Sequence, residues 1–294
     1  GGVTVVRDCG VRVDNWPAAR ASGLHLIRCG RHVARPKRYM RDLPLDVEDQ
    51  RELPEVLASM AHSSDGWVKI VGDWNDRIGV AGGGGGAGAP GPGGAPAVLT
   101  DAVVAVHEAG ARIAVHAFSH RVIDSLIEAG VDDIEHGSGI DADQASEIAA
   151  RGIAVTPTLR QVELFKDFAA QAGAKYPVYA ATMQAMYDAR RSHFQMLVDS
   201  GVLLLMGTDS GGYQAHGTIV GELDLWLQWG APALFTIDAA TWVSQRYLSY
   251  PGLVEGGPAD FLILDEDPRG DPTILAKPAR VTVGGTSVWE RPSV

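Results

Sequence analysis

Short apolar runs alternate with longer amphipathic stretches along most of this chain. Several of the runs are apolar at nearly every position, which is typical of parallel strands buried on both faces. We predict strands at residues 3–6, 24–27, 67–71, 112–115, 132–134, 153–156 and 202–206. Helical stretches lie between them at residues 99–109, 121–129, 142–151 and 178–200, and a glycine follows each one. This alternation predicts an α/β fold with a parallel sheet.

The number and order of these strands suit one architecture in particular. Seven strands with intervening helices predict a (β/α)8 TIM-like barrel over residues 1–250 whose first strand is absent. Residues 251–294 change character, with a strand-like run at 259–265 and two more at 280–283 and 286–289. Gly284 and Gly285 separate the last two runs and predict a tight hairpin. We therefore expect the remnant of a small β-sandwich domain after the barrel.

One glycine-rich stretch interrupts the pattern. Residues 79–96 contain five consecutive glycines and several prolines, a composition too flexible to pack as a regular element. The stretch also lacks the Lys-Ser/Thr ending of a phosphate-binding loop. We expect a loop near the open face of the barrel, and the sequence leaves open whether it forms a lid.

Composition and charge narrow the classes of protein that remain. The 294 residues are 46% hydrophobic and carry a formal net charge of −11, which suits a globular protein and argues against nucleic-acid binding. No apolar run approaches the roughly 18 residues of a membrane span. Two cysteines, Cys9 and Cys29, fit a reducing compartment, so we expect the cytoplasm. The chain begins without Met at a strand edge, so we expect residues upstream, and a signal peptide stays open.

Four polar residues lie at or near the ends of predicted strands: Lys69, His116, His136 and Asp209. Strand ends of a (β/α)8 barrel converge on one site, and two imidazoles with a carboxylate suit an ion such as Zn²⁺. Each residue has a simpler interpretation, because a lone His or Asp often only satisfies a local hydrogen bond. Lys69 must be paired, have a lowered pKa or be carbamylated, since an unpaired buried ammonium is costly.

Several segments together resemble the amidohydrolase superfamily, in its imidazolonepropionase-like and Xaa-Pro dipeptidase-like branch. The matching segments are VTVVRD at 3–8, WVKI at 67–70, VHA at 115–117, GVDDIEHG at 130–137, TPTL at 156–159, GTDSG at 207–211, GEL at 221–223 and GPAD at 257–260. The resemblance implies a metal-dependent hydrolase with two divalent ions, most simply Zn²⁺, bridged by carboxylated Lys69. It further implies that His116 and His136 bind one ion and that Asp209 binds the other and moves the proton.

The resemblance also implies a reaction and a class of substrate. A metal-bridging hydroxide would attack the carbonyl of a C–N amide-type bond in a dipeptide, an N-acyl amino acid or a cyclic amide. His216 and Arg160 would contact this small-molecule substrate, and relatives often form homo-oligomers. The alternatives are a lactonase or phosphotriesterase that hydrolyses esters at the same metal site, and an inactive or truncated relative that only binds ligands.

One family feature is missing from this sequence. Members carry a His-x-His pair on the first barrel strand, and no such pair occurs among the nine histidines. The match begins at what would be the second strand. If the pair is absent from the natural protein, we expect one bound ion instead of two.

Overall fold

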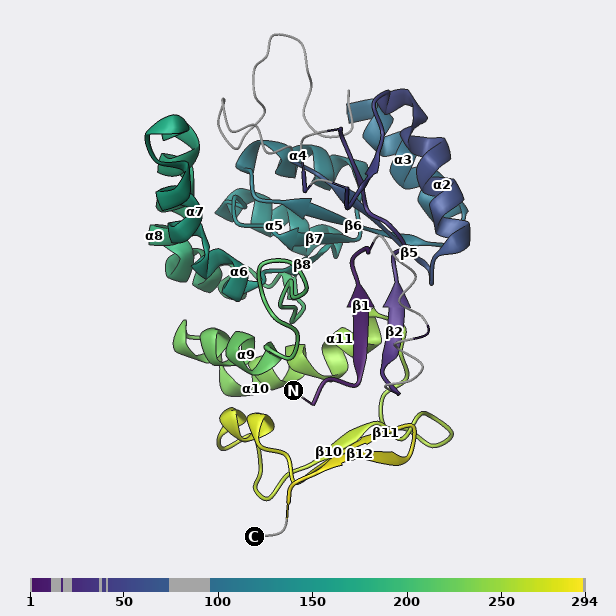
Figure 1. The fold of residues 1–294 in the computed structure, drawn as a ribbon, viewed down its shortest axis with the longest axis vertical. Coiled ribbons are helices and arrows are strands. Elements are labelled where there is room, and N and C mark those ends of the chain that lie inside the picture. The colour runs from purple at the N-terminus through teal and green to yellow at the C-terminus, as the bar shows by residue number, and fades with distance from the viewer. Residues whose placement is uncertain are drawn as a thin grey trace.

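The computed structural model describes residues 2–11, 17, 23–36, 39–40, 42–73 and 96–292. Its centre is a parallel sheet of seven strands in the order β4-β3-β5-β6-β7-β8-β9, and helices cover it (Figure 1). The strands are β3 (Val33–Ala34), β4 (Leu45–Asp46), β5 (Trp67–Val71), β6 (Arg112–Ala117), β7 (Asp133–His136), β8 (Ala154–Thr156) and β9 (Leu203–Leu204). The α/β class predicted from the hydrophobic pattern is confirmed.

The middle of this sheet is buried on both faces. All five residues of β5 and all four of β7 are buried, as expected for strands with helices above and below. The helices that follow the strands are α2 (Leu53–Ser63), α3 (Pro96–Glu108), α4 (His120–Ala129) and α5 (Ala142–Arg151). Their apolar faces join Val68, Ile113 and Ile134 in one core. Helix α5 has the predicted bounds, with Asp141 capping its first turn and Gly152 in the left-handed conformation at its end.

Two strands at the beginning of the chain form a separate sheet. Strands β1 (Val5–Asp8) and β2 (His25–Arg28) pair in parallel, with Asp8 opposite Arg28. Cys9 and Cys29 directly follow these paired ends, and both are free thiols. The N–H of Asp65, just before β5, donates to the carbonyl of Arg28 at the end of β2, and Figure 1 shows the strand pair β1–β2 near β5.

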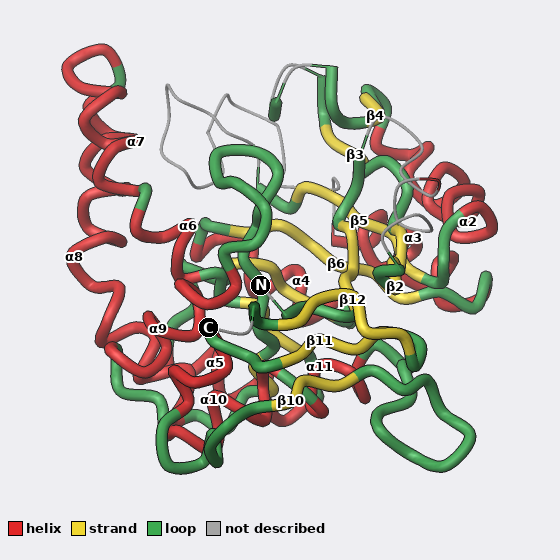
Figure 2. The backbone as a smooth tube through the Cα atoms, turned by 60° about the horizontal axis from the view of Figure 1, so that its bottom comes forward, coloured by secondary structure: helices red, strands yellow, loops and turns green. Residues whose placement is uncertain are grey.

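The second half of the molecule is largely helical. Helices α6 (Leu159–Glu163), α7 (Phe165–Ala172) and α8 (Pro177–Asp199) follow β8. Helices α7 and α8 pack against each other at the edge of the molecule (Figures 1 and 2). Helices α9 (Ile219–Gln228), α10 (Ala233–Ala240) and α11 (Trp242–Tyr247) follow β9 and lie between the large sheet and the C-terminal strands (Figure 1).

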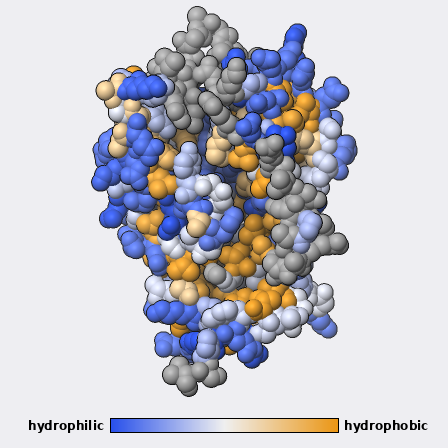
Figure 3. Space-filling model, in the orientation of Figure 1, coloured by the Kyte–Doolittle hydropathy of each residue, from blue (hydrophilic) through white to orange (hydrophobic). Residues whose placement is uncertain are grey.

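A small antiparallel sheet ends the described chain. It consists of β10 (Phe261–Ile263), β11 (Arg280–Val283) and β12 (Thr286–Glu290), which cross the front of Figure 2. Gly284 and Gly285 both have positive φ values, 57° and 77°, so the predicted hairpin turn is confirmed. Figure 3 shows apolar side chains gathered between this sheet and the body of the molecule. That this part is the remnant of a separate domain stays a prediction.

Several boundaries differ from the sequence prediction. Strand β9 has two residues instead of five, and β3, β4, α2, α6, α7 and α9–α11 were not predicted. Residues 79–95 of the glycine-rich stretch lie outside the described residues, and Pro96 begins α3. None of the helices that the structure describes is long and apolar enough to cross a membrane.

Candidate metal centre

Three of the four predicted ligands lie on neighbouring strands of the large sheet. Lys69 is on β5, His116 on β6 and His136 at the end of β7. The register places Val71 opposite His116, and Ala117 opposite His136, so these side chains emerge near one edge. The imidazole rings of His116 and His136 lie edge to face with centroids 4.7 Å apart. The structure therefore brings the two predicted histidines together.

A buried carboxylate orients the first imidazole. His116 Nε2 lies 3.3 Å from an oxygen of Asp73, which follows β5. The other oxygen of Asp73 accepts hydrogen bonds from the backbone N–H groups of Phe118 and Ser119, at 2.6 and 2.5 Å. His116 Nδ1 is buried and has no hydrogen-bond partner among the described residues. The ring is thus held by one nitrogen while the other is left for a ligand.

A hydroxyl group holds the second imidazole in the same way. His136 Nδ1 lies 2.6 Å from Thr158 Oγ1, and the ring packs against Phe118 at 4.7 Å. Both His136 and Thr158 have positive φ values, 67° and 45°, which non-glycine residues rarely adopt. Burial, together with the nearby charges of His116 and Lys69, lowers the pKa of His136 well below its usual value. His136 is therefore neutral near pH 7, the form that can bind a metal.

Lys69 belongs to a buried network of charges. Its ammonium is paired with Glu135 of β7, and Arg7 of β1 pairs with Asp133 of the same strand. Arg7 also lies 3.7 Å from Glu135, and one oxygen of Glu135 has no hydrogen-bond partner among the described residues. Of the three interpretations that the sequence left open for Lys69, this structure has the paired one.

Asp209, the fourth predicted ligand, follows β9 and is the most accessible of the four. It remains exposed and has a positive φ of 53°. Desolvation by the surrounding protein raises the pKa of its carboxyl, and the charges of Lys69 and His116 oppose this rise. The carboxyl of Asp209 is thus under the influence of the same lysine and histidine and can exchange protons with solvent.

Two aromatic residues extend the cluster. The ring of Tyr39 lies 5.2 Å from that of His116 and 5.2 Å from that of His32. His32 is buried, and its Nε2 has no partner within the described part of the chain. Burial and the charge of Lys69 lower the pKa of His32 to about 4.

Of the two residues expected to contact substrate, Arg160 lies in the first turn of α6 and His216 lies on the loop that precedes α9. Arg160 Nε donates to Gln214 Oε1 at 2.8 Å, and its guanidinium lies beside Gly221. His216 is exposed and lies close to Gly211.

The predicted ligands are of types that bind metal ions, but the described side chains are not arranged as a complete metal site. No cluster of three or more His, Cys, Asp and Glu side chains among the described residues is placed to hold an ion. However, metal-binding histidines usually have the remote ring nitrogen hydrogen-bonded by the protein. Asp73 and Thr158 do this for His116 and His136, and His116 Nδ1 is an unpartnered buried nitrogen. We conclude that the residues present fit a divalent metal.

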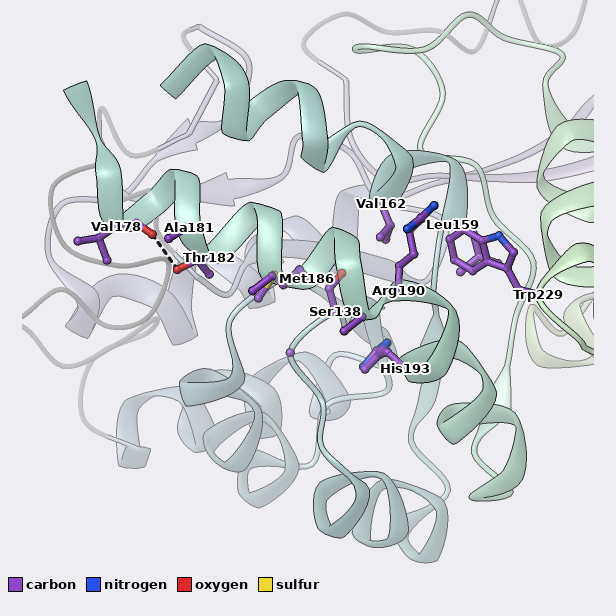
Figure 4. A pocket seen from close by; sticks show the side chains of 13 residues that line it. Ser138, Leu159, Val162, Val178, Ala181, Thr182, Met186, Arg190, His193 and Trp229 are labelled. Atoms are coloured by element: carbon purple, nitrogen blue, oxygen red, sulfur yellow. Dashed lines mark hydrogen bonds between the residues drawn. The ribbon is translucent and has the colours of Figure 1, made fainter. Parts of the chain in front are cut away.

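A largely apolar cavity of about 550 Å³ is lined mainly by residues of α6 and α8. Figure 4 shows Ser138, Leu159, Val162, Met186 and His193 around it, with one face of α8 forming a wall. None of the four predicted ligands lines it. The cavity is therefore distinct from the polar cluster.

Three residues that contact the predicted ligands were not predicted: Asp73 beside His116, Thr158 beside His136 and Glu135 beside Lys69. All three stand at or next to strand ends, which was the available signal, and Glu135 and Thr158 lie within segments already noted. Their roles depend on which side chain of a neighbouring strand they meet. Periodicity alone does not give that information.

The parallel α/β sheet has polar side chains from neighbouring strands gathered at one edge. The Amidohydrolase family model matches residues 1–288, and the chain belongs to that family. This places it among enzymes that hydrolyse C–N bonds, with a TIM-barrel fold. An uncharacterized protein of Mycobacterium bovis is 37% identical over 285 residues, covering 97% of this chain and 75% of the relative. A protein of Mycobacterium tuberculosis matches to the same extent.

Solved structures agree on the fold. A Xaa-Pro dipeptidase with methionine bound in its active site superposes with a TM-score of 0.78 at 21% identity, covering 98% of this chain and 75% of that one. The ochratoxinase of A. niger gives 0.77 at 19% identity, covering 97% and 71%. At these identities the likeness shows the architecture and does not transfer a substrate.

Proposed function

We propose that this protein is a metal-dependent hydrolase of a small-molecule amide, such as a dipeptide, an N-acyl amino acid or a cyclic amide. The observation that carries this proposal is the pair of imidazoles at the ends of adjacent strands, each held by a protein partner at one nitrogen. Family membership adds the reaction class. The substrates named for solved relatives suggest which amides to try first.

The chain's own residues give the ligand set. His116 would bind through Nδ1 and His136 through Nε2, with Asp209 and a carboxylated Lys69 completing the set, and Zn²⁺ is the ion that best matches these donors. A bound ion would lower the pKa of water and polarise the substrate carbonyl. Carboxylation joins CO₂ to Nζ of neutral Lys69 and releases a proton. Glu135 would then lose its ammonium partner and depend on Arg7.

Asp209 is the proposed proton carrier. Its exposed carboxylate accepts a proton from the attacking water and returns it to the leaving nitrogen, as in general acid–base catalysis. The raised pKa of Asp209 strengthens it as a base. We further propose that His216, on the loop before α9, and Arg160, in the first turn of α6, contact the substrate.

A substrate panel tests this proposal. Zn²⁺-loaded protein should hydrolyse amides in preference to matched esters, and Asp209→Asn should lower kcat by roughly 10²- to 10⁴-fold. Asp143→Asn is the control, because Asp143 is an exposed carboxylate in the first turn of α5. Preference for lactones or phosphotriesters, or full turnover by Asp209→Asn, would contradict the proposal.

A further inference from the structure

A completely buried carboxylate lies on helix α9, which follows the loop that contains His216. Glu222 of α9 is 0% exposed and accepts three hydrogen bonds. The donors are the backbone N–H of Leu159 at 2.7 Å, the backbone N–H of Arg160 at 2.9 Å and Trp226 Nε1 at 3.0 Å. Burial raises the pKa of Glu222 to about 7, and these donors oppose the rise because they favour the carboxylate.

Two of the three donors are the first N–H groups of helix α6. The side chain of an N-cap residue normally accepts from the N–H of the second or third residue of the helix, here Arg160 or Gln161, and Thr is a preferred residue there. Thr158 occupies the N-cap position of α6, yet its side chain makes no capping hydrogen bond. Its hydroxyl lies instead 2.6 Å from His136 Nδ1. Glu222 thus caps the first turn of α6 from another helix, while the Thr158 hydroxyl contacts His136.

We propose that Glu222 is a positioning residue for His136, acting through Thr158. Because the carboxylate caps α6 from outside, the Thr158 hydroxyl is released to hold the imidazole. The same contacts fix the backbone of Leu159 and Arg160, directly after Thr158 in its left-handed conformation. The relevance of Glu222 to metal binding rests on the proposed function, whereas its effect on His136 does not.

The substitution Glu222→Gln tests the capping step. An amide presents one oxygen and one NH₂ group, so either Leu159 or Arg160 would face a donor instead of an acceptor. The uncapped N–H then competes for the Thr158 hydroxyl, and the bond to His136 weakens. Glu222→Asp is a second, milder variant, because its shorter side chain keeps the charge while losing reach toward α6.

The readout is the side-chain nitrogen NMR signal of His136 in the metal-free protein. Thr158→Val removes the hydroxyl and gives the reference shift for an unheld ring, while Thr158→Ser keeps the hydroxyl. We expect Glu222→Gln and Glu222→Asp to move the His136 Nδ1 signal toward the Thr158→Val value. Combining Glu222→Gln with Thr158→Val should add little further change, because both act on one bond.

Trp226→Phe is the matched control. It removes the third donor to Glu222 and leaves both α6 groups capped, so the His136 signal should stay in place. A normal His136 signal in both Glu222 variants would overturn the proposal. So would an equal shift in Trp226→Phe, because loosening of α9 alone would then explain it.

Metal affinity provides the second readout. Loss of such supporting contacts typically weakens metal binding by about 10- to 100-fold, and we expect this for Zn²⁺ in Glu222→Gln and not in Trp226→Phe. If the unsubstituted protein binds no Zn²⁺, the proposed function fails. The His136 signal would still decide whether Glu222 positions the ring.

Discussion

Substitution of a single residue in the buried ion pairs of this site should lower the stability of the protein. Lys69 and Glu135 are almost inaccessible to solvent, at 7% and 5% exposure of their side chains, and they neutralise each other. Arg7 and Asp133 form the adjacent pair. Removing one member of such a pair leaves an uncompensated charge in a dry environment.

We therefore expect Lys69→Met to lower the free energy of unfolding by about 3–5 kcal/mol in the metal-free protein. The double variant Lys69→Met with Glu135→Gln should be less destabilised than the sum of the single changes. Urea unfolding measures the free energy of unfolding of the single and double variants. Arg151→Met is the control, because the half-exposed Arg151–Glu147 pair on α5 contributes at most about 0.5 kcal/mol. Equal effects in the buried and exposed pairs would contradict this account of Lys69.

His32 should make stability depend on pH. Its pKa is about 4 in the folded protein and near 6.5 when unfolded, so the unfolded state binds more protons between these values. The contribution is complete above pH 6.5 and is lost as the pH falls toward 4, on the order of 3 kcal/mol.

Thermal unfolding of the parent and of His32→Gln at several pH values checks this expectation. Relative to the parent, the variant should become more stable as the pH is lowered through that interval. A constant difference in Tm between the two proteins would show that His32 does not titrate as a buried group.

The sequence indicated single site residues only where a polar or charged side chain lay within or directly after a predicted apolar strand. Lys69 was noticed because a lysine in an apolar strand is unusual, and the histidines because they follow strands. Glu135 lies in an equally buried strand, but its partner is on another strand, and cross-strand pairing is not visible in a linear pattern. Glu222 lay within the segment GEL and was assigned no role, because the two backbone N–H groups that it caps are more than sixty residues away in sequence.

At the scale of elements, long periodic segments were predicted well. Strand β5 and helix α5 have the predicted bounds, because a continuous apolar run and a capped amphipathic helix are strong local signals. The two-residue strands β3 and β4 were missed, since their pairing depends on β5 and not on their own sequence. The end of β5 approaches β6 closely at Gly72.

Gly72 follows β5 and donates from its N–H to the carbonyl of His116 at 2.7 Å. A Cβ atom at this position would lie 2.6 Å from both that carbonyl oxygen and Val115 Cγ1. We expect Gly72→Ala to destabilise the fold by about 1–3 kcal/mol and to displace His116.

Gly212→Ala is the matched control, because a Cβ atom there meets nothing within 4 Å. Denaturant midpoints of the two variants give the comparison. A Gly72→Ala protein as stable as the Gly212→Ala protein would show that the end of β5 can move away from β6.

At the scale of the whole molecule, the arrangement of the strands brings the candidate site residues together. The predicted parallel sheet is confirmed, and it places residues from β5, β6 and β7 at one edge although they are up to 67 positions apart in sequence. The predicted barrel is confirmed by the family match and the solved structures. The substrate could not be predicted, because it depends on loops whose side chains have no regular pattern.

The number of metal ions bound per chain tests the central claim most directly. Elemental analysis of protein purified without chelator should find about one or two Zn²⁺ ions per chain. His116→Ala and His136→Ala should lower this number, and Asp143→Asn should not. A full complement of metal in both histidine variants, or no metal in the parent protein after dialysis against Zn²⁺, would contradict the account.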